Sequence, residues 1–156
     1  MKRRATVRTM LVTAGLVALA GCATTRGVMG SGDPIDDRQR LMKNVGANWG
    51  DIQNKAKAGN VEAIAVNAEA LALHSLRIPS LFPEGTLSPA KSAAKPEIWQ
   101  KWPEFEAAAK NLTTRAEQLR ETAKSKNGPA TLAMVKDFGR LACGACHTPF
   151  RVPPKQ

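Results

Sequence analysis

Four segments of the chain carry apolar residues at the three- and four-residue spacing of an amphipathic helix, and none alternates like a half-buried strand. The first begins at Asp33-Pro34, which is typical of an N-cap followed by proline at the first helical position, and it fades at Gly59. The second begins near Asn60 and stops before Pro79, where a loop rich in Pro, Ser and Gly follows.

The third and fourth segments occupy the C-terminal half of the chain. Because Pro103 would break a helix running from Pro96, we expect a short turn at 97–102 and a main helix with Pro103 at its first position. The fourth segment begins at Gly128 and ends near Pro149. Four such helices with short connections predict an all-α fold, an antiparallel four-helix bundle. The apolar residues expected to face its core are Ile35, Met42, Val45, Trp49, Ile52, Val61, Ile64, Ala68, Leu71, Ala72, Phe105, Ala109, Leu112, Ala116, Leu119, Leu132, Val135, Phe138, Leu141 and Ala142.

Such a bundle would have a thin core of its own. Aromatic residues make up only 4% of the chain, and there is no Tyr. A buried cofactor would supply the missing apolar bulk.

The fourth segment ends in Cys143-Gly144-Ala145-Cys146-His147, which matches the C-x-x-C-H pattern of covalent haem attachment. Two thiols three residues apart on one helical turn can each form a thioether with a haem vinyl group. The adjacent imidazole then becomes an axial ligand of the iron. The motif therefore predicts one haem c, held by Cys143 and Cys146 and ligated by His147.

Two other uses of this motif fit less well. A C-x-x-C redox site normally accompanies a βαβ pattern, and the sequence shows no strand pattern. A structural zinc site needs four ligands, and outside the motif only His74 is available as a further histidine.

The N-terminal residues read as an export signal. A basic start leads into an apolar stretch too short to span a bilayer, which ends in Leu19-Ala20-Gly21-Cys22. This ending resembles the signal box of bacterial lipoproteins, in which the cysteine is acylated. We expect a signal peptide at 1–21, lipidated Cys22 with a flexible tether at 22–32, and a helical domain at 33–156.

The charge of the chain does not favour nucleic acid as a partner. The formal net charge is +10, and removal of residues 1–21 leaves 19 basic and 13 acidic side chains, a net +6. These charges are scattered and form no basic stripe, so we expect solvated faces that could steer an acidic redox partner.

Three side chains are candidates for the sixth iron ligand: Met42, His74 and Met134. Met134 precedes His147 by 13 residues on the same predicted helix, roughly 20 Å along its axis, too far to reach the opposite haem face. His74 is more typical of a hydrogen-bonded or surface residue. From the residues alone, Met42 serves equally well as ligand and as core filler.

Several segments resemble the cytochrome c′ family of class II c-type cytochromes. Residues 38–49 (RQRLMKNVGANW) are similar to the first-helix pattern of that family, and LFPEGT (81–86), PEIW (96–99) and CGACHTPFR (143–151) also resemble family segments. Pro103 and the lipoprotein signal depart from the family pattern.

The resemblance implies roles for two residues of the first helix. Low-spin members carry Met at the position of Met42, where it ligates iron, whereas high-spin members leave an open site for small gases. Arg38, one turn earlier, would contact a haem propionate, and Arg151 would lie near the haem edge. Relatives often form dimers through their first two helices, so a homodimer is possible.

These observations predict a non-enzymatic, single-electron carrier, anchored by lipid on the periplasmic side of a bacterial membrane and working between redox partner proteins. Two alternatives remain: a five-coordinate haem protein that binds nitric oxide or carbon monoxide, and a haem-free helical lipoprotein that binds metal or a partner protein.

Overall fold

The computed structural model describes residues 32–154. Within them the chain forms α1 (Pro34–Lys57), α2 (Ile64–Ser75), α4 (Trp102–Lys124) and a final helix built from α5 (Gly128–Phe138), the π turn η2 (Gly139–Cys143) and α6 (Gly144–Phe150). Two short elements, η1 (Pro79–Leu81) and α3 (Glu97–Gln100), lie in the connection between α2 and α4. No helix of this part of the chain has the length and apolar character needed to cross a bilayer.

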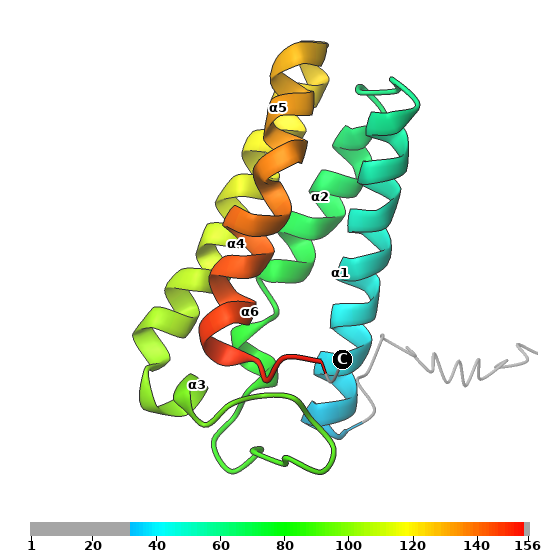
Figure 1. Ribbon diagram of the computed structural model, residues 1–156. Helices are drawn as coiled ribbons and strands as arrows, with labels where there is room; N and C mark the ends of the chain where they lie inside the picture. Colours follow the sequence, from blue (N-terminus) through cyan, green and yellow to red (C-terminus); the bar gives the residue numbers. More distant parts are fainter. Residues whose placement is uncertain (1–31, 155–156) are drawn as a thin grey trace, which may run out of the picture.

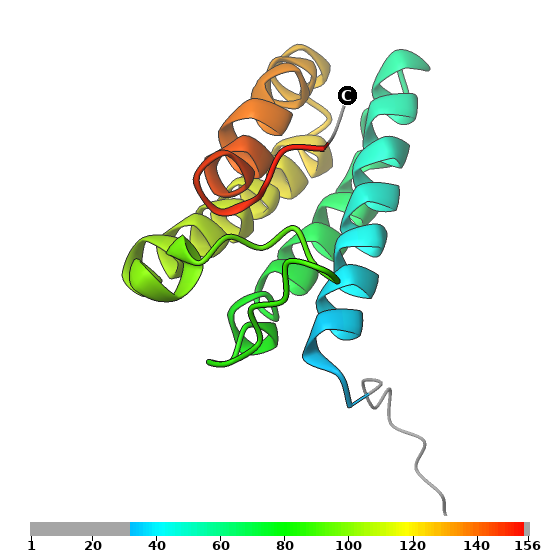
Figure 2. The same ribbon diagram turned by 60° about the horizontal axis from the view of Figure 1, so that its bottom comes forward.

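The four long helical stretches run alternately up and down, as the predicted antiparallel bundle requires (Figure 1). Viewed from its lower end, the bundle consists of two pairs, α1 with α2 and α4 with α5–α6 (Figure 2). The long connection after α2 and the C-terminal segment pass across this end of the bundle (Figures 1 and 2).

Local sequence signals set the helix starts. The Asp33 side chain accepts a 2.8 Å hydrogen bond from the Ile35 amide, with Pro34 at the first helical position. Asn127 caps α5 in the same way, by accepting from the Ala130 amide at 3.1 Å. At the other end of α1, Gly59 adopts a positive φ of +73°, a conformation that glycine reaches without steric cost because it lacks a β-carbon.

The core lies mainly between α2 and α4, the two helices that pack most extensively. The side chains of Ile64, Leu71, Phe105 and Leu119 are almost fully buried. Burial of such a side chain stabilises the fold by about 1.5–3 kcal/mol relative to exposure.

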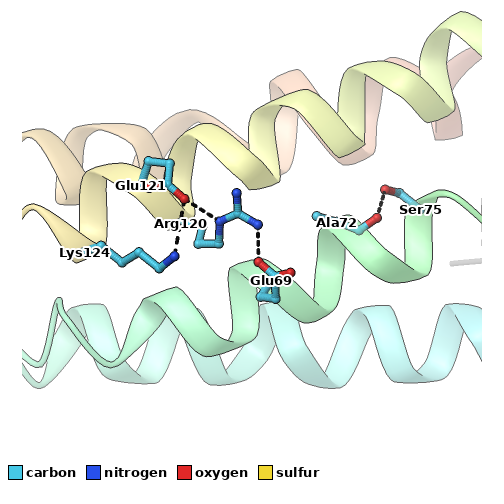
Figure 3. Close-up of polar contacts among 6 residues, drawn as sticks. All are labelled: Glu69, Ala72, Ser75, Arg120, Glu121 and Lys124. Carbon is cyan, nitrogen blue, oxygen red and sulfur yellow. Dashed lines mark hydrogen bonds and ion pairs between the residues drawn. The ribbon is translucent and has the colours of Figure 1, made fainter.

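Polar contacts join α2 to α4, and Figure 3 shows the pair formed by Arg120 and Glu69 together with the Ser75 hydroxyl. The buried hydroxyl of Ser75 donates to the carbonyl of Ala72 at 2.6 Å and lies 2.7 Å from the hydroxyl of Thr113 on α4. Nearer the surface, Arg120 on α4 pairs with Glu69 on α2 and with Glu121. The buried hydroxyl pair specifies register, whereas the half-exposed ion pairs contribute little stability.

Three sequence expectations need correction. The second helix begins at Ile64 and not near Asn60, because turns follow Gly59. Leu132 was expected in the core but is 42% exposed, since α5 buries only Thr131 and Phe138. The fourth helix is not one regular helix, because the π turn interrupts it at 139–143, where the cysteine motif begins.

Candidate haem site

A cavity of ≈ 730 Å³ lies between α1 on one side and η2–α6 on the other. This volume falls within the range typical of small-molecule and cofactor pockets. Its walls are mostly apolar, and they come from α1, the connection before α4, α3, α4 and the final helix. The lining residues are Arg38, Gln39, Met42, Lys43, Val45, Gly46, Trp49, Ile78, Phe82, Ser92, Ala93, Ala94, Ile98, Phe105, Gly139, Cys143, Cys146, His147, Phe150 and Arg151.

The cavity brings together residues that are about a hundred positions apart in the sequence. Cys143, Cys146 and His147 line it from the final helix, and Arg38 and Met42 line it from α1. The two other candidates for a sixth ligand do not line the cavity: Met134 packs against the hydrophobic core, and His74 lies in the last turn of α2. Cys22 lies outside the described residues.

The motif side chains are electrically neutral at physiological pH. Burial raises the pKa of the Cys143 thiol, and it raises the pKa of Cys146 to about 11, with a smaller contribution from Cys143. Although His147 is partly exposed, the partial burial of its imidazole disfavours the charged form and lowers its pKa. The positive charge of Arg151 lowers this pKa further. A neutral imidazole is the form that binds a metal ion.

The π turn places these residues relative to α4. Its hydrogen bond from the Gly144 amide to the Gly139 carbonyl spans five residues instead of four. The Asn111 side chain on α4 donates a 2.7 Å hydrogen bond to the Leu141 carbonyl within the turn. Apolar periodicity gave no sign of the π turn or of Asn111, because neither alters the spacing of buried residues enough to be noticed.

Arg38 is the most buried charged residue of the site, with 3% exposure. Its Nη1 donates to the Thr86 hydroxyl at 3.0 Å, and its Nη2 donates to the Thr86 carbonyl at 2.9 Å and the Ser92 hydroxyl at 3.0 Å. The guanidinium also lies 4.7 Å from the centroid of the Phe82 ring. Burial lowers its pKa, an effect that the charge of Asp33 opposes.

Through these bonds Arg38 holds one end of the cavity loop, residues 86–95. Three further hydrogen bonds hold this loop to α1 and to the C-terminal segment: Gln39 Nε2 to the Lys91 carbonyl (2.5 Å), the Lys95 amide to the Phe150 carbonyl (3.0 Å), and the Val152 amide to the Ala93 carbonyl (2.8 Å). The loop therefore forms a fixed wall of the cavity that the sequence did not predict.

The residues present fit a covalently bound haem. The cavity offers an apolar interior, two thiols and a neutral imidazole on adjacent turns of one helix. The Nε of Arg38 is buried without a hydrogen-bond partner, which leaves a donor for a carboxylate. Within residues 32–154 no group of three or more His, Cys, Asp and Glu side chains could hold a metal ion by itself.

Comparisons with known proteins agree with this fit. The cytochrome c′ family model matches residues 33–151. A cytochrome c-556 of Agrobacterium fabrum is 28% identical over 137 residues, covering 86% of this chain and 90% of that protein. A cytochrome c′ of Rhodospirillum rubrum is 29% identical over 155 residues, covering 93% and 99%.

Solved structures share the fold. The cytochrome c′ of Thermochromatium tepidum superposes with a TM-score of 0.69 at 25% identity, covering 81% of this chain and 100% of that one. The cytochrome c′ of Rubrivivax gelatinosus gives a TM-score of 0.67 at 25% identity, covering 78% and 96%. The predicted four-helix bundle is thereby confirmed.

The family consists of periplasmic, non-enzymatic haem proteins that bind one haem c covalently through C-x-x-C-H. The predictions of one covalent haem c and of a non-enzymatic protein are thereby confirmed. A haem-free lipoprotein is accordingly the wrong alternative. With the family model covering the whole helical domain and the motif lining its cavity, this chain belongs to the cytochrome c′ family of c-type cytochromes.

Proposed function

We propose that this protein is a membrane-anchored single-electron carrier whose haem iron is ligated by His147 and Met42. Cys143 and Cys146 form the two thioethers to the haem. Haem supplies a one-electron couple at its iron, and methionine–histidine ligation raises the reduction potential and closes the iron to other ligands. Both properties suit electron transfer and not gas binding.

The observation that carries this proposal is the position of Met42. The half-buried side chain of Met42 lines the cavity from α1. The cysteine motif lines the same cavity from the final helix. The similar proteins include both cytochromes c-556 and cytochromes c′. Their names do not decide between the low-spin and high-spin groups, so Met42 itself is the basis of the assignment.

Arg38 supports the haem in this proposal. Its Nη atoms are used by the cavity loop, but its buried Nε is free to donate to a haem propionate. A charge-assisted bond of this kind is stronger than a neutral one.

The test of ligation is the response of the reduced protein to carbon monoxide. A Met42-ligated iron gives a spectrum that does not change when carbon monoxide is added at low concentration. A spectrum that converts at once to a carbon monoxide complex would instead identify the five-coordinate gas-binding protein.

The membrane anchor is a separate part of the proposal. It rests on the sequence of residues 1–22, with Cys22 as the acylated residue and residues 22–32 as the tether to the domain. Acyl chains on one residue would hold the haem domain at the periplasmic surface of a membrane, near membrane-bound redox partners.

We further propose that the chain forms a homodimer through α1 and α2. One solved relative of the same fold is described as having a ligand-controlled dimer dissociation. In this chain Val66 and Leu73 on α2 and Leu76 directly after it are 74%, 56% and 65% exposed, so large apolar side chains face solvent along this element. A second α2 would cover them.

A further inference from the structure

The residues that line the cavity carry positive charge only. Arg38, Lys43 and Arg151 line it, and no Asp or Glu does. Arg38 is buried, whereas Lys43 and Arg151 are exposed and come from separate elements, α1 and the segment that follows α6. Positive charge is therefore present on two sides of the opening.

The cavity loop adds two more cations. Lys91 is exposed, and its backbone carbonyl accepts a hydrogen bond from the side chain of Gln39, which lines the cavity. Lys95 extends its Nζ to within 3.4 Å of the Thr148 carbonyl, next to His147. We name Lys43, Lys91, Lys95 and Arg151 the basic rim.

The basic rim is not neutralised by the protein. In the described part of the chain none of its four members takes part in an ion pair. Some cations outside the rim are paired, such as Arg40 with Asp37 at 2.6 Å and Arg140 with Asp137 at 3.0 Å, whereas others within the described residues, such as Lys57 and Lys110, take part in no ion pair. The charged side chains that line the cavity are thus of one sign.

Haem would not reverse this sign. Its two propionates can cancel at most two of the five positive charges formed by Arg38 and the basic rim. Clustered charge of one sign around an open cleft raises the encounter rate of oppositely charged partners, and the effect falls steeply with ionic strength.

We propose that the basic rim is the docking surface for an acidic redox protein, which exchanges electrons with the haem through the cavity opening. This inference rests on the proposed electron-carrier function and names the partner's chemistry. Docking at the rim would place the partner at the opening of the cavity that would hold the haem, so that steering there would be productive. Four charges around one opening suit the acidic surface of a protein better than a nucleic acid, which would call for a longer basic stripe.

The first test measures oxidation of the ferrous holoprotein by stopped flow. Each encounter transfers one electron, from iron(II) haem to ferricyanide, which becomes ferrocyanide, or to the cation tris(phenanthroline)cobalt(III), which becomes cobalt(II). The Lys43→Glu/Arg151→Glu variant is compared with a Lys57→Glu/Lys110→Glu control, whose exposed lysines do not line the cavity.

At low salt we expect the rim variant to react about tenfold more slowly with ferricyanide and faster with the cobalt complex. Both differences should vanish near 1 M salt, where the screening length falls to about 3 Å. The control should stay within about twofold of the wild type. Equal rates for the rim variant and the control would overturn the proposal.

The second test uses poly-L-glutamate as a model of an acidic protein surface. It should slow the ferricyanide reaction of the wild type and leave that of the rim variant unchanged. Vesicles containing phosphatidylglycerol, mixed with Cys22→Ser protein that lacks the anchor, provide the comparison. Protection by vesicles without protection by poly-L-glutamate would show that the rim meets a membrane, and would also overturn the proposal.

The two proposals fail in different ways. If Met42 does not ligate iron, the wild-type spectrum is high-spin whatever the salt dependence of the rates. If the basic rim does not dock acidic partners, the spectra of all variants remain low-spin while their rates do not respond to charge.

Discussion

The side-chain amide of Asn111 on α4 donates a 2.7 Å hydrogen bond to the carbonyl of Leu141, inside the π turn that ends at Cys143, the first residue of the motif. Arg115 fixes the amide by donating from its Nε to Asn111 Oδ1 at 2.9 Å. The π turn shifts every later residue around the helix axis relative to a regular α-helix. Asn111 therefore ties α4 to the orientation of the motif.

Replacement of Asn111 by Ala should destabilise the folded holoprotein by about 1–3 kcal/mol, because the Leu141 carbonyl loses its partner. Denaturant unfolding followed at the haem absorption band measures this change. Asn54→Ala on the exposed side of α1 is the matched control and should stay within about 0.5 kcal/mol of the wild type. An Asn111→Ala protein as stable as the control would exclude the proposed positioning role.

Substitutions at Arg38 should separate its two roles. Arg38→Lys keeps the charge but cannot reproduce the forked bonds to Thr86 and Ser92, so the cavity loop should be cleaved faster by trypsin at Lys91, its one trypsin site. Arg38→Met also removes the positive charge. The loss of this charge stabilises the ferric state relative to the ferrous state. Its reduction potential should fall by on the order of 60 mV, a tenfold change for one electron.

Potentiometric titration and timed proteolysis measure these two effects. A Lys91→Gln protein, in which the cavity loop lacks its trypsin site, controls for cleavage elsewhere. If Arg38→Met has the wild-type potential, then the Arg38 charge does not act on the haem.

The helices could be predicted from the sequence because their signals are local. Asp33-Pro34 and Asn127 mark helix starts, and the apolar spacing of Phe105, Ala109 and Leu112 marks the buried face of α4. The prediction that Leu132 lies in the core was wrong, because apolar spacing does not show where α5 lacks packing neighbours and is exposed.

The cavity could be predicted only in part. The C-x-x-C-H motif names its own chemistry, and the first-helix resemblance pointed to Arg38 and Met42, which line the cavity. The cavity loop, the Asn111 contact and the basic rim join residues that are far apart in the chain, so no local pattern reports them.

The exposed apolar face of α2 predicts a dimer that one charge can break. Leu73→Glu should convert the protein to monomers, because a buried unpaired carboxylate is costly at an interface. Sedimentation velocity measures the change, and Leu132→Glu, on the exposed side of α5, should leave the dimer intact. A monomeric wild type at high micromolar concentration would contradict this interface.

Cys22→Ser should release the protein from membranes. Without acyl chains the haem domain has no anchor, so it should move from the membrane pellet to the soluble fraction of cells that mature c-type cytochromes. Ala23→Ser, beside the acylated residue, should leave the protein in the pellet. Intact mass spectrometry of the wild type checks the modification directly, and a mass without acyl groups would refute the anchor.

Iron ligation by Met42 is the claim on which the proposed function depends, and the ferric absorption spectrum tests it most directly. We expect the wild type to show the methionine–iron charge-transfer band in the far red, and Met42→Leu to lose it and become high-spin with its covalent haem intact. Met134→Leu should keep the band. A high-spin ferric spectrum in the wild type, unchanged by Met42→Leu, would contradict the account.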